Sequence, residues 1–150
     1  MRVFSSLQEF ERAVGTRLGH GEWLEVTQDR VDCFADATGD HQWIHVDPER
    51  AATGPFGTTI AHGFLTLSLV PLLTEGIVRV EGFSAAVNYG CNKVRFPAHV
   101  PVGSRIRAGV ELVSVERAAA GALSTTRVTV ELDGSEKPVC VADTLTLMIP

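Results

Sequence analysis

The sequence lacks the features of several large protein classes. It has 13 lysines and arginines against 18 aspartates and glutamates, and the net charge of −5 argues against a nucleic-acid surface, which needs a basic face. The three cysteines, Cys33, Cys91 and Cys140, are an odd number without a CxxC pair, so neither a disulfide framework nor a zinc knuckle is expected. No sustained apolar run follows Met1, which predicts no signal peptide and makes a reducing cytoplasm the expected location.

Motifs for several kinds of catalysis are absent as well. There is no Gly-x-Ser-x-Gly nucleophile elbow, no GxGxxG, no P-loop and no HExxH, so serine hydrolysis and the usual nucleotide-phosphate sites are not supported. His41 and His45 lie four residues apart, but Gly39 disfavours a helix there and no third ligand is near in the sequence, so we expect no metal site. The most apolar segment, residues 64–73, is too short to cross a membrane.

What the sequence does contain is a polar connection between two helical patterns. Upstream of it, apolar or small residues recur at i, i+3, i+4 and i+7, which predicts a helix over about residues 29–38. Thr27 is the expected N-cap of this helix, and Gly39 suits the left-handed residue that closes it. Asp47-Pro48 is typical of an N-cap followed by proline at the first position of a second helix. The chain between the two helices should therefore be fixed at both ends.

Asp40 and His45 lie five residues apart in this connection. A carboxylate and an imidazole that are held rigidly against a cleft can perform acid–base chemistry, and the flanking helices would supply the rigidity. The alternative is a turn aspartate after a helix-ending glycine, beside a histidine that belongs to the surface or the core. The pair alone does not decide between these two interpretations.

A second stretch, residues 54–63, is a loop rich in turn-forming residues that leads into the apolar segment 64–73. Because this segment is apolar on nearly all sides, it predicts a buried central helix rather than a surface helix. Gly63 would place backbone N–H groups at the positive end of the helix dipole, which suits a developing oxyanion. The alternative is a glycine that only permits close packing, and His62 beside it is expected only to pack or to cap.

Taken together, the two stretches resemble a known family. Gly39-Asp40-x-x-x-x-His45, followed by Ala61-His62-Gly63 and an apolar helix, is similar to the MaoC-type, R-specific enoyl-CoA hydratases, also called hydratase 2. The usual motif of that family is Gly-Asp-x-Asn-Pro-hydrophobic-His, and here Gln42-Trp43 stands where Asn-Pro is usual. The resemblance covers about residues 27–103 and leaves the loop shape and the acyl-chain preference open.

This resemblance implies a fold and a quaternary state. The expected fold is a single α+β hot-dog domain over residues 1–150, in which an antiparallel sheet wraps around a central apolar helix. A homodimer is also implied, since sites in the family lie at or near a dimer interface. Alternating patterns agree with several strands, which we predict over residues 83–87, 92–96, 106–112, 126–132 and 139–149. Before them we predict a helix that begins after Ser6 and ends at Gly15, and an extended piece over residues 21–26.

The resemblance also implies a reaction, the reversible hydration of trans-2-enoyl thioesters to (R)-3-hydroxyacyl thioesters. Hydration needs a base on water, an acid near Cα and a donor to the thioester carbonyl. Asp40 and His45 would share the water and proton steps, and the Gly63 N–H would polarise the carbonyl. Which of Asp40 and His45 contacts the water stays open. No cofactor is expected beyond the coenzyme A or acyl carrier protein that carries the substrate.

Four basic residues stand close together in the sequence of this acidic chain: Lys93, Arg95, Arg105 and Arg107. Lys93 and Arg95 are candidates to meet the phosphates of coenzyme A. The alternative is an ordinary solvated strand face.

Two other functions remain open at this point. A thioesterase could use the same fold to hydrolyse the acyl thioester, and release of free thiol would identify it. A non-catalytic acyl-thioester-binding protein, for example in nodulation-factor-like or polyketide pathways, would bind substrate without turnover, and the Gln42-Trp43 departure keeps this possibility open.

Overall fold

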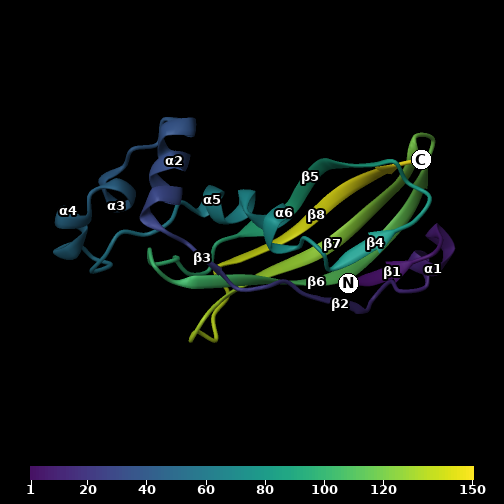
Figure 1. Ribbon diagram of the computed structural model, residues 1–150, viewed down its shortest axis with the longest axis horizontal. Coiled ribbons are helices and arrows are strands. Elements are labelled where there is room, and N and C mark those ends of the chain that lie inside the picture. Colours follow the sequence, from purple (N-terminus) through teal and green to yellow (C-terminus); the bar gives the residue numbers. More distant parts are fainter.

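A long, strongly curved antiparallel sheet forms the body of the molecule in this computed structural model, which describes residues 1–150 (Figure 1). Its strands lie in the order β2-β6-β7-β8-β5, and the short β3 also pairs with β6. The bounds are β2 (Arg17–His20), β3 (Leu24–Glu25), β5 (Ala85–Arg95), β6 (Arg105–Ala118), β7 (Gly121–Leu132) and β8 (Cys140–Ile149). A separate parallel pair joins β1 (Arg2–Phe4) to β4 (Val78–Val80).

The three central strands follow the predicted alternation. Ile106, Ala108, Val110 and Leu112 on β6 are buried, while the residues that alternate with them are partly or fully exposed. Their register sets Ala108 opposite Val130 of β7, which in turn lies opposite Cys140 of β8, so one face of the sheet is a continuous apolar surface. Residues 106–112, 126–132 and 139–149 are therefore strands as predicted, although β6 and β7 extend further into a long hairpin.

The prediction of two strands over residues 83–87 and 92–96 was wrong, because one long strand, β5, covers most of both ranges. Its pairing with β8 shifts register between Asn88 and Gly90 and again between Asn92 and Arg95. These two bulges interrupt the alternation that a sequence pattern relies on. The short strands β1, β2 and β4 were not predicted, since three or four residues carry too little pattern.

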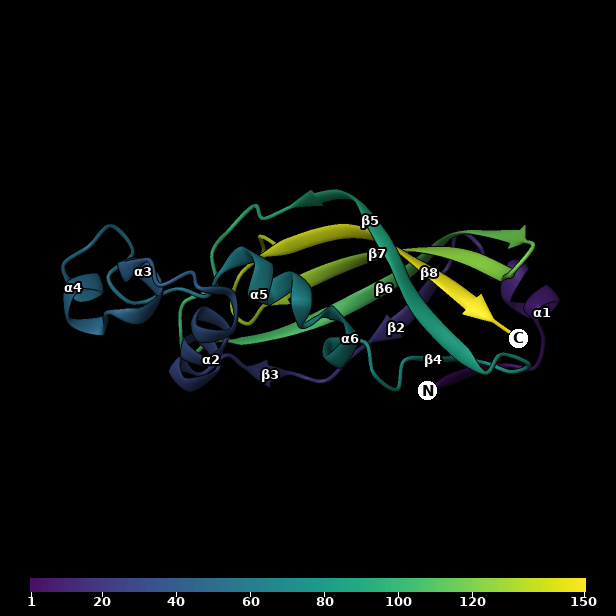
Figure 2. The ribbon, with the colours of Figure 1, turned by 90° about the horizontal axis from the view of Figure 1, so that it is seen from above.

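The apolar segment packs on the concave face of the sheet as two short helices, α5 (Gly63–Ser68) and α6 (Val70–Leu73). Figure 2 shows them lying over the strands, where α5 contacts β8 and α6 contacts β6. The segment was predicted as one helix. Pro71 has no N–H to donate to the helical ladder, and the chain is interrupted at Leu69. The predicted sheet around an apolar helix is confirmed, but Phe64 and Leu72 are exposed, so the helix is not buried on all sides.

Three further helices stand beyond one end of the sheet, opposite the end that holds α1 (Leu7–Glu11) and the C-terminus (Figure 1). They are α2 (Gln28–Thr38), α3 (Trp43–Val46) and α4 (Pro48–Ala52). The predicted caps are confirmed: the Thr27 hydroxyl accepts from the Arg30 N–H at 3.3 Å, and Gly39 closes α2 with φ of 79°. The Asp47 carboxylate accepts from the Arg50 N–H at 3.0 Å, with Pro48 at the start of α4.

Three local predictions need correction. The one-turn helix α3 was not expected inside the connection. The first helix, capped by Ser6 as predicted, ends at Glu11 rather than at Gly15. The expected extended piece over residues 21–26 is a strand only at β3.

None of the helices combines the length and the apolar character that a membrane crossing requires.

Candidate active site

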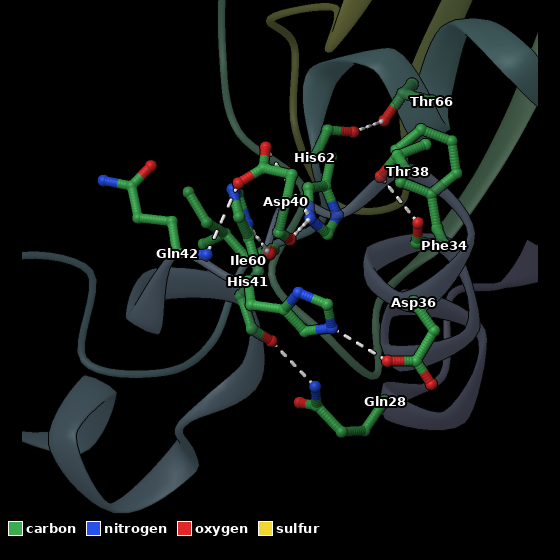
Figure 3. A network of polar contacts seen from close by, with 11 residues as sticks. Gln28, Phe34, Asp36, Thr38, Asp40, His41, Gln42, Ile60, His62 and Thr66 are labelled. Carbon is green, nitrogen blue, oxygen red and sulfur yellow. Dashed lines mark hydrogen bonds and ion pairs between the residues drawn. The ribbon is translucent and has the colours of Figure 1, made fainter.

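The predicted pair, Asp40 and His45, comes together in space with a third residue, His62. One carboxylate oxygen of Asp40 and one ring nitrogen from each histidine lie within 4.8 Å of one another. Figure 3 shows Asp40, which follows the end of α2, and His62, which directly precedes α5. His45 lies on α3. The Asp40 side chain is 55% exposed, whereas His45 and His62 are buried. The site therefore exposes its carboxylate to solvent and buries its two imidazole rings.

The orientation of the His45 ring follows from one short hydrogen bond. Its Nδ1 lies 2.7 Å from the main-chain oxygen of Ile60. A carbonyl oxygen can only accept, so Nδ1 carries the proton and Nε2 of the neutral ring keeps its lone pair. Burial lowers the pKa of His45, the nearby His62 ring lowers it further, and the Ile60 hydrogen bond and the Asp40 charge oppose these effects. At neutral pH the ring is therefore a neutral acceptor at Nε2.

The one-turn helix that carries His45 is held from two sides. The Ile60 N–H donates to the oxygen of Ile44 at 3.0 Å, in addition to the contact with the His45 ring. The Gln28 amide, at the start of α2, donates to the His45 oxygen at 2.8 Å and accepts from the Thr59 hydroxyl at 2.6 Å. The loop before α5 and the first turn of α2 thus fix α3. From the sequence, only the two flanking helices were expected to hold this connection rigid.

His62 was expected only to pack or to cap, and the structure gives it closer contacts than that. Its Nε2 lies 2.9 Å from the main-chain oxygen of Asp40, and its ring stacks on His45 with centroids 3.8 Å apart. No sequence pattern could have found these contacts, because His62 is 22 residues from Asp40 in the chain. The only available signal was its position next to Gly63.

Gly63 is the first residue of α5, as predicted. Its N–H has no acceptor within its own helix, since first-turn N–H groups never do. A Cβ built on Gly63 would also lie 3.0 Å from the ring of Phe96. Both sequence-based interpretations, the free donor and the close packing, are therefore compatible with the structure.

The four basic residues do not form one cluster, which corrects that part of the prediction. Arg105 and Arg107 lie on β6, and β7 and β8 separate that strand from β5. Arg105 pairs with Asp133, and Arg107 pairs with Glu131 at 2.8 Å.

Lys93 and Arg95, the two candidates for coenzyme A, remain together on β5. Lys93 lies at a bulge with φ of 53°, and its Nζ is 3.9 Å from a carboxylate oxygen of Asp143. Asp143 is already bound by Arg127 at 2.9 Å, so the exposed Lys93 ammonium is only loosely engaged. Contact of Lys93 and Arg95 with phosphate stays a prediction.

Any metal or other cation at this site would have to use Asp40, His45 and His62, whose ligand atoms converge. The expectation of no metal was based on the lack of a third ligand nearby in the sequence, and the fold removes that argument. One nitrogen of each ring already donates to a main-chain oxygen, and for His62 that nitrogen, Nε2, is the one 4.0 Å from the Asp40 carboxylate.

A large open cavity of about 900 Å³ lies between the α5–α6 segment and the sheet. Leu67, Ser68 and Pro71 line it from the helices. Its sheet side carries hydroxyl groups as well as apolar groups, and Thr126 and Thr144 bond to one another there at 2.9 Å. The α5–α6 segment begins at Gly63, directly after His62. The cavity and the three-residue site therefore lie along the same segment of the chain.

Comparisons with known proteins agree with this geometry. The family model of the MaoC like domain matches residues 9–134. The chain is 57% identical over 146 residues to 3-hydroxyacyl-thioester dehydratase Z of Mycobacterium tuberculosis, covering 97% of each protein. It is 44% identical over 146 residues to nodulation protein N of Rhizobium leguminosarum bv. viciae, covering 95% of this chain and 91% of that protein. In fold it is similar to the (R)-hydratase from A. caviae involved in PHA biosynthesis, with a TM-score of 0.73 at 24% identity, covering 91% of this chain and 96% of that one.

The fold and these relatives define an enzyme of the hydratase and dehydratase class, and the predicted hot-dog fold is confirmed. The chain belongs to the MaoC-like dehydratase family. The family resemblance seen in the sequence is therefore correct.

Proposed function

We propose that this enzyme catalyses the reversible hydration of trans-2-enoyl thioesters to (R)-3-hydroxyacyl thioesters. The observation that carries the proposal is the convergence of Asp40 with His45, which the Ile60 oxygen fixes in the Nδ1–H form and which has a ring nitrogen within 4.8 Å of an Asp40 carboxylate oxygen. The 57% identity with a protein named 3-hydroxyacyl-thioester dehydratase supports the same substrate class. The R configuration follows the family resemblance.

In the hydration direction, His45 Nε2 takes a proton from a water molecule while the water oxygen bonds to Cβ. The electron pair of the double bond moves toward the thioester carbonyl and forms an enolate. Asp40 stabilises the imidazolium that forms on His45, and the Gly63 N–H donates to the enolate oxygen. The imidazolium then returns its proton to Cα, so one water has been added and His45 is neutral again.

The cavity below the α5–α6 segment has room for an acyl chain. Helix geometry places Leu67 of α5 about 6 Å along the axis from Gly63, at about 1.5 Å per residue, and Pro71 follows on α6. A chain whose thioester carbonyl meets Gly63 would thus reach the cavity after a few carbons. The carrier would extend outward, where Lys93 and Arg95 could meet the phosphates of coenzyme A or of a carrier-protein prosthetic group.

A homodimer would complete this arrangement. β5 pairs only with β8, so its other edge is unpaired, and Val87 and Tyr89 on it are 46% and 66% exposed. An unpaired edge with exposed apolar side chains suits pairing with β5 of a second copy. The cytoplasmic location stays a prediction.

The test is the loss of enoyl-thioester absorbance with crotonyl-CoA, followed by chiral analysis of the product. Formation of (R)-3-hydroxybutyryl-CoA without release of free thiol is the expected result. Release of coenzyme A would instead identify the thioesterase. Binding without turnover, on crotonyl and on longer or carrier-bound enoyl chains, would identify the non-catalytic binding protein.

A further inference from the structure

His62 is the residue of the site that has no task in the reaction described above. It is 3% exposed and lies directly before α5. Its ring packs between the rings of Phe34, at 5.0 Å, and His45, at 3.8 Å with an interplanar angle of 25°. A buried imidazole in contact with both reacting groups calls for a physical explanation.

We propose that His62 is a positioning residue for the hydration reaction, which fixes Asp40 through a hydrogen bond and His45 through ring stacking. The inference rests on the proposed function and deepens it. It concerns how the two reacting groups keep their relative geometry, although no hydrogen bond joins them directly.

The hydrogen bond acts on Asp40. The main-chain oxygen of Asp40 accepts from His62 Nε2 at 2.9 Å, and His62 Nε2 lies 4.0 Å from the nearer carboxylate oxygen (Figure 3). The only other contact of the Asp40 carboxylate is a long one, 3.4 Å from the Gln42 N–H. Asp40 follows the left-handed Gly39, where the helix no longer constrains the chain. The bond from His62 is thus the shorter of the contacts that locate Asp40.

The stacked ring acts on His45. Its Nδ1–H bond to Ile60 fixes one point of the imidazole but leaves the ring free to tilt about that point. The His62 ring covers one face of His45 at contact distance and removes that freedom. The His45 ring, and Nε2 with it, is then held in one orientation.

A packing role alone does not explain an imidazole at this position. Nδ1 of His62 is buried and has no hydrogen-bond partner. Buried polar atoms without a partner are rare and unfavourable. A phenylalanine would fill the same space and would bury no polar atom. The Nε2–H donor to Asp40 is what a phenylalanine would lack.

Two substitutions separate the two contacts. His62→Phe keeps a ring against His45 and removes the donor to Asp40, whereas His62→Gln keeps an N–H donor of similar reach and removes the ring. We expect each to lower kcat for crotonyl-CoA hydration by about 10- to 100-fold, as misplacement of reacting groups does, with KM within about threefold. His62→Phe should keep or raise the Tm. His41→Gln, a matched change at an exposed neighbour that pairs with Asp36, should leave kcat unchanged.

A second readout does not depend on turnover. Long-range ¹H–¹⁵N spectra of the imidazole rings should show His45 in the Nδ1–H form and His62 in the Nε2–H form in the wild type. In His62→Gln the Ile60 oxygen still holds His45 in the Nδ1–H form, but the order parameters of the His45 ring C–H bonds should fall because the ring can tilt. His62→Phe should leave these order parameters unchanged. If the wild type gives no turnover, the proposed function fails, and the spectra still test the positioning.

The proposal is overturned if kcat of both variants stays within about threefold of wild type, or if any loss of kcat only follows a loss of Tm. Unchanged order parameters of the His45 ring in His62→Gln would also contradict the stacking contact as the element that holds the ring.

Discussion

The imidazole rings of His45 and His62 stack with centroids 3.8 Å apart, and each ring donates one N–H to a different main-chain oxygen. His45 donates from Nδ1 to Ile60, and His62 donates from Nε2 to Asp40. The two rings therefore donate from opposite nitrogens. The stack brings together the connection after α2 and the loop before α5, which is how two separate sequence stretches become one site.

The pH dependence of catalysis should reflect the environment of His45. Burial, then the neighbouring His62 ring, lowers the pKa of His45 below its ordinary value of 6.5. The reaction needs the neutral ring, so activity is lost only when the pH falls below this lowered pKa. We expect the acid limb of the kcat/KM profile for crotonyl-CoA to lie below pH 6.5.

The same shift has a consequence for stability with a definite sign. The unfolded chain binds a proton at His45 at higher pH than the folded chain does, so the folded state loses stability as the pH falls from the ordinary value toward the lowered one. Above the ordinary value the contribution is constant. Unfolding curves of wild type and His45→Phe across this pH range measure this contribution to stability. For catalysis, an acid limb of the kcat/KM profile at or above pH 6.5 would contradict the role of His45 as the base.

Gly63 allows a direct test of the oxyanion donor. Gly63→Ala adds a Cβ that meets the Phe96 ring at 3.0 Å but keeps the N–H, whereas Gly63→Pro removes the N–H. Proline is tolerated at the first helical position, and the φ of −61° and ψ of 138° at His62 suit a residue that precedes proline. We expect kcat of Gly63→Pro to be about 10²- to 10³-fold below that of Gly63→Ala. Equal kcat values would leave close packing as the only role of Gly63.

The local parts of this structure could be predicted from sequence, and the long-range parts could not. Thr27, Gly39 and Asp47 act within a few residues of their own positions, so the ends of α2 and α4 follow from residue type. The contact from His62 to Asp40 spans 22 residues and exists only after the loop before α5 folds back. The central strands followed their alternation, while the bulges of β5 broke it.

The residues considered for the candidate site also divide into those that the sequence indicates correctly as neighbours and those that it does not. Asp40, His45 and Gly63 could be proposed from the sequence because their spacing, their turn chemistry and the family resemblance mark them. Arg105 and Arg107, by contrast, are near Lys93 in sequence but belong to a strand that two others separate from β5. Closeness in sequence says nothing about strand order, which depends on the packing of the whole sheet.

The hydroxyl pair in the cavity should influence the choice of acyl chain. Replacing Thr126 and Thr144 together by valine removes both partners of the 2.9 Å bond and leaves no unpaired group. We expect kcat/KM for long straight-chain enoyl-CoA substrates to rise about fivefold, equivalent to about 1 kcal/mol of better apolar contact. Crotonyl-CoA is too short to reach the pair and serves as the control. Equal changes for both substrates would show that the chain does not enter this cavity.

The unpaired edge of β5 predicts the quaternary state. Val87→Lys places a charge on this edge and should convert a dimer to a monomer, since charged side chains block edge pairing. Val3→Lys is a matched control, because Val3 on β1 and Val87 are both 46% exposed. Sedimentation velocity of the two variants measures the effect. Dimers of equal stability in both variants would place the interface elsewhere.

The hydration rate of crotonyl-CoA with Asp40→Asn, compared with wild type at equal Tm, tests most directly whether Asp40 and His45 form the reaction centre. Asparagine keeps the shape of the side chain and removes the charge that stabilises the His45 imidazolium. The account predicts a fall in kcat of about 10²- to 10⁴-fold, and His45→Ala should show a loss of the same order. A folded Asp40→Asn enzyme with kcat within about threefold of wild type would contradict it.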